Sequence, residues 1–209
     1  MGRGAPPLGP QGPTPSNSVA SWEDWWPEKP MAWIVGFALL YFAAYWLSDF
    51  ITDITKIIPD RVSLIYLPAF VRVVSVLVAG LAGLLGIFVG TLAVSLVYLG
   101  DPAHLALANA SASAAGIGLS YWLLIKAMGR RSLPLNLPVL VLLTVLYSTF
   151  NAVIHGLVWD LIGMSDGLST TDLTLMMIGD LAGVVLMYFV FRSAIRYVRR
   201  DKSPSESVR

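Results

Sequence analysis

Apolar residues occur along this chain in long uninterrupted runs, and not in the apolar–polar alternation of a half-buried strand. The runs cover residues 31–48, 62–100, 104–124, 138–159 and 173–191. A helix needs about 20 apolar residues to cross a hydrocarbon core about 30 Å thick. The pattern predicts an all-α, polytopic transmembrane helical bundle. It excludes a β-barrel in practice, because barrel strands alternate in polarity.

The run over residues 62–100 is nearly twice a bilayer-spanning length at about 1.5 Å per residue. We interpret it as two short spans, 62–79 and 83–99, that turn around Gly80–Gly83. Pro68 should kink or unwind the first of them, because proline removes a backbone donor. This division predicts about six spans and a cytoplasmic N-terminus. A single crossing by residues 62–100 would give five spans and the opposite N-terminal side.

The two ends of the chain are polar and are expected to lie outside the bundle. Residues 1–30 are rich in Pro, Gly and Ser and predict a disordered tail, and 201–209 form a short polar tail. The transmembrane domain is therefore residues 31–200. Three tryptophans close to the first span suit either an interfacial anchor or a partner contact: Trp22, Trp25 and Trp26.

The amino-acid composition argues against several classes of function. Hydrophobic residues make up 56% of the chain and charged residues 13%, and the net charge of +1 does not indicate nucleic acid as a partner. The absence of cysteine and the presence of only two histidines predict no metal cluster and no thiol chemistry. No nucleophile motif and no phosphate-binding loop occurs, so we expect no enzymatic activity, and no cofactor is identified.

Basic residues indicate the orientation in the membrane. They follow the fourth and sixth predicted spans, whereas the loop between the fifth and sixth holds only acids. The positive-inside rule then places these basic segments in the cytoplasm, together with the C-terminus. The basic residues concerned are Lys126, Arg130, Arg131, Arg192, Arg196, Arg199, Arg200 and Lys202.

Polar residues inside the apolar runs are the candidate functional site. They are Arg72, Asn109, Asn151 and Asp180, with His155 nearby. Ionisable groups in hydrocarbon usually face the bundle interior and pair with one another. With six spans, these residues share one layer in the outer half of the membrane, and Arg72 with Asp180 is the expected ion pair.

Two interpretations of this network remain open. It could only fix the register of the helices, as buried polar pairs often do. Alternatively, it could be a ligand or ion site open to the outer side, with His155 at its rim and able to sense pH. For His104 and His155, the simpler alternative is that both are ordinary residues at the membrane–water interface.

Short motifs in the apolar runs resemble the MASE1 family of bacterial membrane sensor domains. The Pro-containing stretch Ile65-Tyr66-Leu67-Pro68-Ala69 is followed by the Gly-rich stretch 85–91, as in that family. The last span carries Gly179-Asp180 followed by small and apolar residues, and Asn109 in the small-residue span also fits. The resemblance covers residues 34–196 and implies a sensory or ligand-binding module in the bacterial inner membrane.

Two features depart from the family pattern. MASE1 domains usually have more spans and precede a cytoplasmic kinase or cyclic-di-GMP-turnover domain, whereas this chain stops soon after Arg200. Tyr66-Leu67-Pro68 also stands where members often have a Trp-Pro-Pro-like motif. We therefore expect a module that acts through a separate membrane or cytoplasmic protein, with Arg192 and Arg196 as contact candidates. An accessory subunit of a membrane complex is the alternative, and a small-solute transporter is the third.

Overall fold

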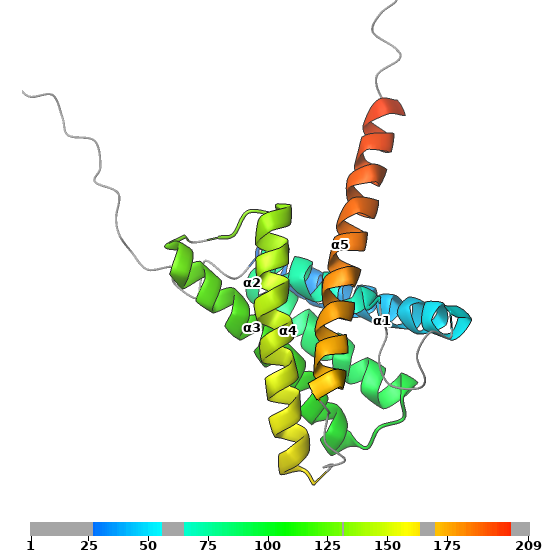
Figure 1. Cartoon of the computed structure of the whole chain (residues 1–209). Helices are drawn as coiled ribbons and strands as arrows, with labels where there is room; N and C mark the ends of the chain where they lie inside the picture. The colour runs from blue at the N-terminus through cyan, green and yellow to red at the C-terminus, as the bar shows by residue number, and fades with distance from the viewer. Residues whose placement is uncertain (1–26, 56–64, 131, 164–169, 202–209) are drawn as a thin grey trace, which may run out of the picture.

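Five α-helices account for most of the chain. The computed structural model describes residues 27–55, 65–130, 132–163 and 170–201, and within these ranges it contains no strand. The elements are α1 (Pro30–Thr55), α2 (Leu67–Ala93), the π-helical turn η2 (Val94–Tyr98), α3 (Ala103–Met128), α4 (Leu137–Leu161) and α5 (Thr170–Asp201). The all-α fold class is thus confirmed (Figure 1).

Four helices are long and apolar enough to cross a membrane, by length and composition. These segments are Pro30–Thr52, Leu67–Tyr98, Leu137–Leu161 and Thr174–Tyr197. The predicted six spans are not confirmed. The difference has two sources: Leu67–Tyr98 forms one interrupted helical segment, and α3 is not among the four. The small side chains of α3, many of them Ala, Ser and Gly, contribute little hydropathy.

The interruption of α2 lies at Gly80, inside the turn that the sequence predicts. Gly80 has φ 52° and ψ −122°, which residues with a side chain rarely adopt. A Cβ on Gly83 would lie 2.0 Å from the carbonyl oxygen of Ser75. Residues eight positions apart in a straight helix are about 12 Å apart along its axis. The chain therefore bends back on itself at Gly80.

The two halves of α2 pack against α1 in opposite directions. The hydroxyl of Tyr66, just before α2, lies 3.2 Å from that of Tyr41, and Tyr98 at the end of η2 donates a 2.6 Å hydrogen bond to Asp49. Both ends of the α2–η2 segment thus lie beside residues 41–49 of α1. The half before Gly80, residues 67–79, covers about 20 Å, less than the ~30 Å hydrocarbon core.

Proline does not kink α2, contrary to the prediction for Pro68. Among the described residues, α2 begins at Leu67, so Pro68 occupies the first turn. Its missing N–H would have no intrahelical partner at that position, and proline is well tolerated there. In α4, Pro138 also lies in the first turn, and the side chain of Asn136 caps the helix by accepting from the Val139 N–H at 3.1 Å.

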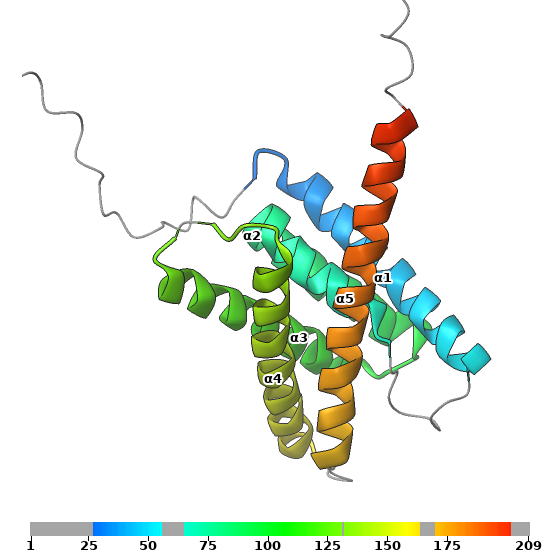
Figure 2. The same cartoon turned by 45° about the horizontal axis from the view of Figure 1, so that its top comes forward.

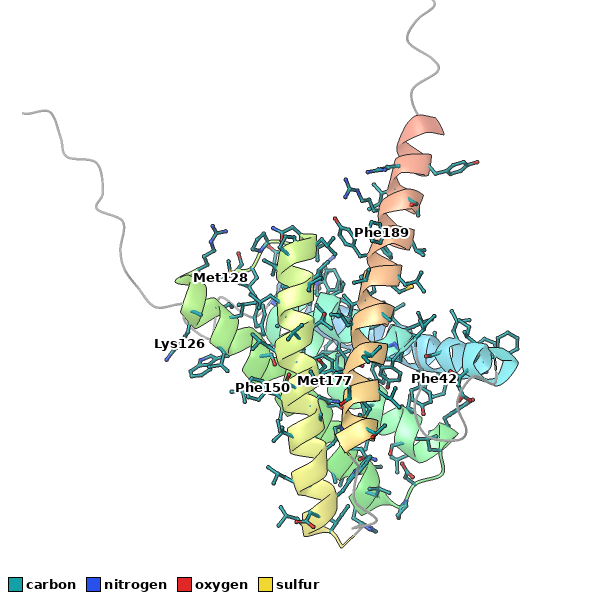
Figure 3. The ribbon with its side chains drawn as sticks, in the orientation of Figure 1. Phe42, Lys126, Met128, Phe150, Met177 and Phe189 are labelled. Carbon is teal, nitrogen blue, oxygen red and sulfur yellow. The ribbon has the colours of Figure 1, made fainter. Side chains whose placement is uncertain are left out.

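The core lies where α2, α3, α4 and α5 meet. One apolar cluster joins residues such as Val73, Ile117, Leu143 and Val184 from these four helices, and a second joins α1 to α2. Helices α4 and α5 run side by side while α1 and α2 cross them (Figures 1 and 2). The C-terminal end of α5 extends beyond the other helices (Figure 3).

Several predictions fall outside the described residues. These are the disorder of the N-terminal tail, the interfacial tryptophans Trp22, Trp25 and Trp26, the position of Arg131, and the C-terminal polar tail.

Candidate functional site

A buried arginine occupies the centre of the bundle. Arg72 lies in the second turn of α2 and is only 5% exposed. Its guanidinium carbon lies 5.2 Å from the ring centroid of Tyr41, 5.4 Å from that of Tyr66 and 5.5 Å from that of Tyr147. Aromatic faces attract cations electrostatically, and more strongly where water is excluded. Three tyrosines from α1, the start of α2 and α4 therefore surround one cation.

The same guanidinium hydrogen-bonds to hydroxyl groups on three helices. It donates to the hydroxyls of Tyr147 and Tyr41, and at 3.3 Å to Oγ of Ser113 on α3. Tyr41 and Ser113 are each 1% exposed and Tyr147 is fully buried. Planar guanidinium groups present five donors in a fixed fork, so one side chain can tie several helices together.

Ser113 extends the network to His155. The Ser113 Oγ lies 3.3 Å from Nε2 of His155, which is 7% exposed. The His155 ring packs edge-on against Trp159, with centroids 5.5 Å apart. Ser113 thereby connects the arginine on α2 to the interior face of α4.

Some buried polar atoms at this site have no hydrogen-bond partner among the described residues. They are Nε of Arg72, Oδ1 of Asn151 and Nδ1 of His155. Asn151 is 3% exposed and lies one helical turn from both Tyr147 and His155 on α4. An unpaired buried polar group costs free energy, so such atoms call for an explanation.

The predicted ion pair between Arg72 and Asp180 does not form. Asp180 is 4% exposed, and it interacts electrostatically with Arg72 and Tyr147. Within the described part of the chain, however, the hydrogen-bond partners of the Arg72 side chain are hydroxyl groups, and no carboxylate contacts it. The tyrosine hydroxyls take up the donors that the sequence analysis assigned to Asp180.

Asp180 lies where α5 makes its closest contact with α2. The backbone N–H of Tyr66 donates to the carbonyl oxygen of Gly179 at 3.1 Å. A Cβ on Gly183 would lie 2.2 Å from the carbonyl oxygen of Tyr66, so only glycine permits this approach. The Gly-Asp motif of the last helix therefore docks α5 directly beside the arginine centre.

Asn109 is the predicted site residue that lies at the edge of the network. It is partly buried, and its Oδ1 accepts a 2.9 Å hydrogen bond from Nε1 of Trp159. Trp159 also contacts His155, so Asn109 is connected to the centre through one aromatic ring. The structure thus brings Arg72, Asn151, His155 and Asp180 into the interior and leaves Asn109 at one side.

Three partners of Arg72 were not anticipated from the sequence: Tyr41, Tyr147 and Ser113. Tyrosine is expected in the interfacial belts of membrane proteins, so Tyr41 and Tyr147, well inside apolar runs, could have been recognised as partners for Arg72. Ser113 lies in a run of small residues, which indicates close helix packing. Its role as a hydrogen-bonding residue was therefore not recognised.

The remaining candidates lie outside this centre. Arg192 and Arg196 are exposed on the projecting part of α5, and His104 is exposed at the start of α3. Within the described ranges, no group of three His, Asp or Glu side chains is placed to hold a metal ion.

Comparisons with protein-family models, with curated proteins and with solved structures find no match for this chain.

Proposed function

We propose that this chain is a MASE1-like, non-enzymatic module of the bacterial inner membrane, which binds a ligand at the Arg72 centre and signals to a separate partner protein. The observation that carries the proposal is the direct connection between the centre and α5. Tyr66 packs its ring on the guanidinium of Arg72, and its backbone N–H donates to Gly179. One residue thus contacts both the candidate ligand site and the candidate output helix.

The C-terminal end of α5, the proposed output end, exposes both charged and apolar side chains that could contact a partner protein. Arg192 and Arg196 are exposed there beside the apolar Phe191 and Ile195. Figure 1 shows this end projecting from the bundle. Many proteins transmit a binding signal through a small shift of one helix between two alternative packing arrangements. A ligand that moves Tyr66 would move this basic segment.

The basic residues also suggest how the chain is oriented in the membrane. Lys126 and Arg130 at the end of α3 and the basic end of α5 face the cytoplasm, following the positive-inside rule. The partner would then be a cytoplasmic protein or the cytoplasmic part of a membrane protein.

The coupling can be tested by measuring the position of α5. The chain has no cysteine, so cysteines introduced at Ser132 and Ser193, both exposed, can carry spin labels without background. Tyr147→Phe removes one hydroxyl from the arginine centre, and we expect it to shift or broaden the distance distribution. Tyr197→Phe, which removes a hydroxyl from an exposed side chain, is the matched control and should leave the distribution unchanged.

An unchanged distribution in Tyr147→Phe contradicts the signalling proposal. If the protein still co-purifies with a stable partner complex in mild detergent, the accessory-subunit function would replace it. The Arg72 centre would then serve only to fix the register of the helices.

A further inference from the structure

Asp180 is a buried carboxyl group in the contact between α5 and α2. It is 4% exposed, and among the described residues its carboxyl group forms neither a hydrogen bond nor an ion pair. We propose that the signal detected by this module is a change of pH, received as a proton by the carboxylate of Asp180. This inference rests on the proposed function and names its ligand. The proton comes from solvent, and its uptake converts the carboxylate into a neutral carboxylic acid.

Two opposing effects act on the charge of this carboxyl group. Moving a carboxylate out of water costs free energy unless an opposite charge or a hydrogen-bond donor contacts it. Arg72 attracts the carboxylate across the protein interior and so favours the charged form. The hydrogen bonds of Arg72, however, go to the hydroxyls of Tyr41, Tyr147 and Ser113. Because no direct contact fixes the charged form, the carboxyl group can exchange a proton.

Other titratable and charged groups reach this region from α2 and α4, the helices that pack on α5. They are Arg72 in α2, Tyr66 just before it, and Tyr147 and His155 in α4. Arginine stays protonated, and tyrosine ordinarily loses its proton only near about pH 10. His155 is thus the other group that can titrate near neutral pH. Its hydrogen bond and ring contact are with Ser113 and Trp159, on α3 and α4, whereas Asp180 lies on α5 itself.

The charge of Asp180 acts on the docking of α5. Gly179, the residue before it, accepts from the Tyr66 N–H at 3.1 Å, and Gly183 faces the Tyr66 carbonyl oxygen. As a carboxylate, Asp180 is attracted to Arg72 of α2, because opposite charges attract beyond contact distance in a low-dielectric interior. As a neutral acid it loses this attraction. Proton uptake therefore loosens the docking of α5 on Tyr66, and proton release tightens it.

The test measures the position of α5 as a function of pH. The full-length protein in detergent carries spin labels on cysteines introduced at Ser132 and Ser193, both exposed. The series runs from about pH 5 to about pH 9, where exposed carboxylates stay charged. We expect a single transition in which the mean label distance shifts by about 1–2 Å, the size of helix shifts in other protein switches.

Three variants assign this shift. Asp180→Asn keeps the size of the side chain but cannot titrate, so it should hold the low-pH distance at every pH. Asp160→Asn is the matched control, because it removes an exposed carboxylate from α4, and it should keep the wild-type midpoint. His155→Gln removes the other group that titrates near neutral pH, and it should also keep that midpoint. The wild-type series and His155→Gln still test the proton site if Asp180→Asn fails to fold.

A label distance that does not change with pH overturns the inference. A pH dependence that persists in Asp180→Asn also overturns it, and one that His155→Gln abolishes makes the histidine the sensor. Tyr147→Phe, compared with the wild type at one pH, tests the coupling to α5 without any titration. If Tyr147→Phe shifts the distance and pH does not, the proton is the wrong ligand and the proposed function stands. If Tyr147→Phe leaves the distance unchanged, the proposed function itself fails.

Discussion

The carbonyl oxygen of Tyr66 faces Gly183 so closely that a Cβ on this glycine would lie 2.2 Å from it. The contact is between backbones, so no flexible side chain can give way. The hydrogen bond from Tyr66 N–H to Gly179, at 3.1 Å, lies one turn earlier on α5. Together these contacts make the start of α2 the docking point of the last helix.

Substitution of Gly183 should therefore displace α5. Gly183→Ala should destabilise the protein by about 1–3 kcal/mol through overpacking, even though alanine favours helix by about 1 kcal/mol over glycine. The measurement is the Tm in detergent. Gly156→Ala in α4 is the control, because a Cβ there meets nothing within 4 Å, and it should be neutral or stabilising. A Gly183→Ala protein as stable as Gly156→Ala would contradict the close docking.

Much of this architecture could be predicted from the apolar runs. The apolar runs overlap the observed helices, because a helix that satisfies its own backbone is the favoured form of a long apolar segment in a bilayer. The turn at Gly80 was also predicted. The span count was not, because a run interrupted by glycine does not reveal whether each half crosses the membrane.

The site could be predicted only in part. A charged or amide side chain in an apolar run indicates burial, and Arg72, Asn151 and Asp180 are indeed buried. The hydrogen-bond partners of these buried side chains are harder to predict from sequence, because they depend on which side chains the helix crossings bring close together. Tyrosine counts as apolar in a hydropathy pattern, so the hydroxyl groups that take up the Arg72 donors were not anticipated.

Arg72 and Asp180 should still be energetically coupled, although they do not form an ion pair. Their electrostatic interaction acts through a low-dielectric interior, where charges influence one another beyond contact distance. Arg72→Met should cost about 3–5 kcal/mol, since it leaves tyrosine hydroxyls and Asp180 without a cation. Asp180→Asn should cost less, because no direct hydrogen bond to Arg72 is lost.

A double-mutant cycle measures this coupling. We expect the double variant to be less destabilised than the sum of the single variants, by about 0.5–3 kcal/mol, the range for residues in one network. Reversible unfolding in detergent supplies the free energies. Strict additivity would show that the carboxylate does not influence the arginine centre.

Gly80 should tolerate no side chain. Its φ of 52° with ψ of −122° is strained for any residue with a Cβ, so Gly80→Ala should cost about 1–3 kcal/mol. Gly36→Ala in α1 is the matched control, because a Cβ there meets nothing within 4 Å and the backbone is helical. Both variants are compared by Tm. Equal stability of the two would mean that the bend of α2 relaxes without cost.

The orientation of the bundle should place the ends of α3 and α5 in the cytoplasm. Lys126 and Arg130 are exposed at the end of α3, and Arg192 and Arg196 are exposed on α5. Helix α4 starts near the end of α3 and finishes near the start of α5, and α5 runs antiparallel to α4. The basic ends of α3 and α5 therefore lie on the same side of the bundle. The positive-inside rule then assigns that side to the cytoplasm.

Cysteine labelling in intact cells tests this orientation, and the cysteine-free chain gives no background. Single cysteines at Ser132 and Ser203 should resist a membrane-impermeant reagent until the cells are permeabilised. A cysteine at Leu161, exposed at the opposite end of α4, should react in intact cells and so report that the reagent has access. Labelling of Ser132 or Ser203 without permeabilisation would reverse the orientation. It would also place the projecting basic end of α5 on the wrong side for a cytoplasmic partner.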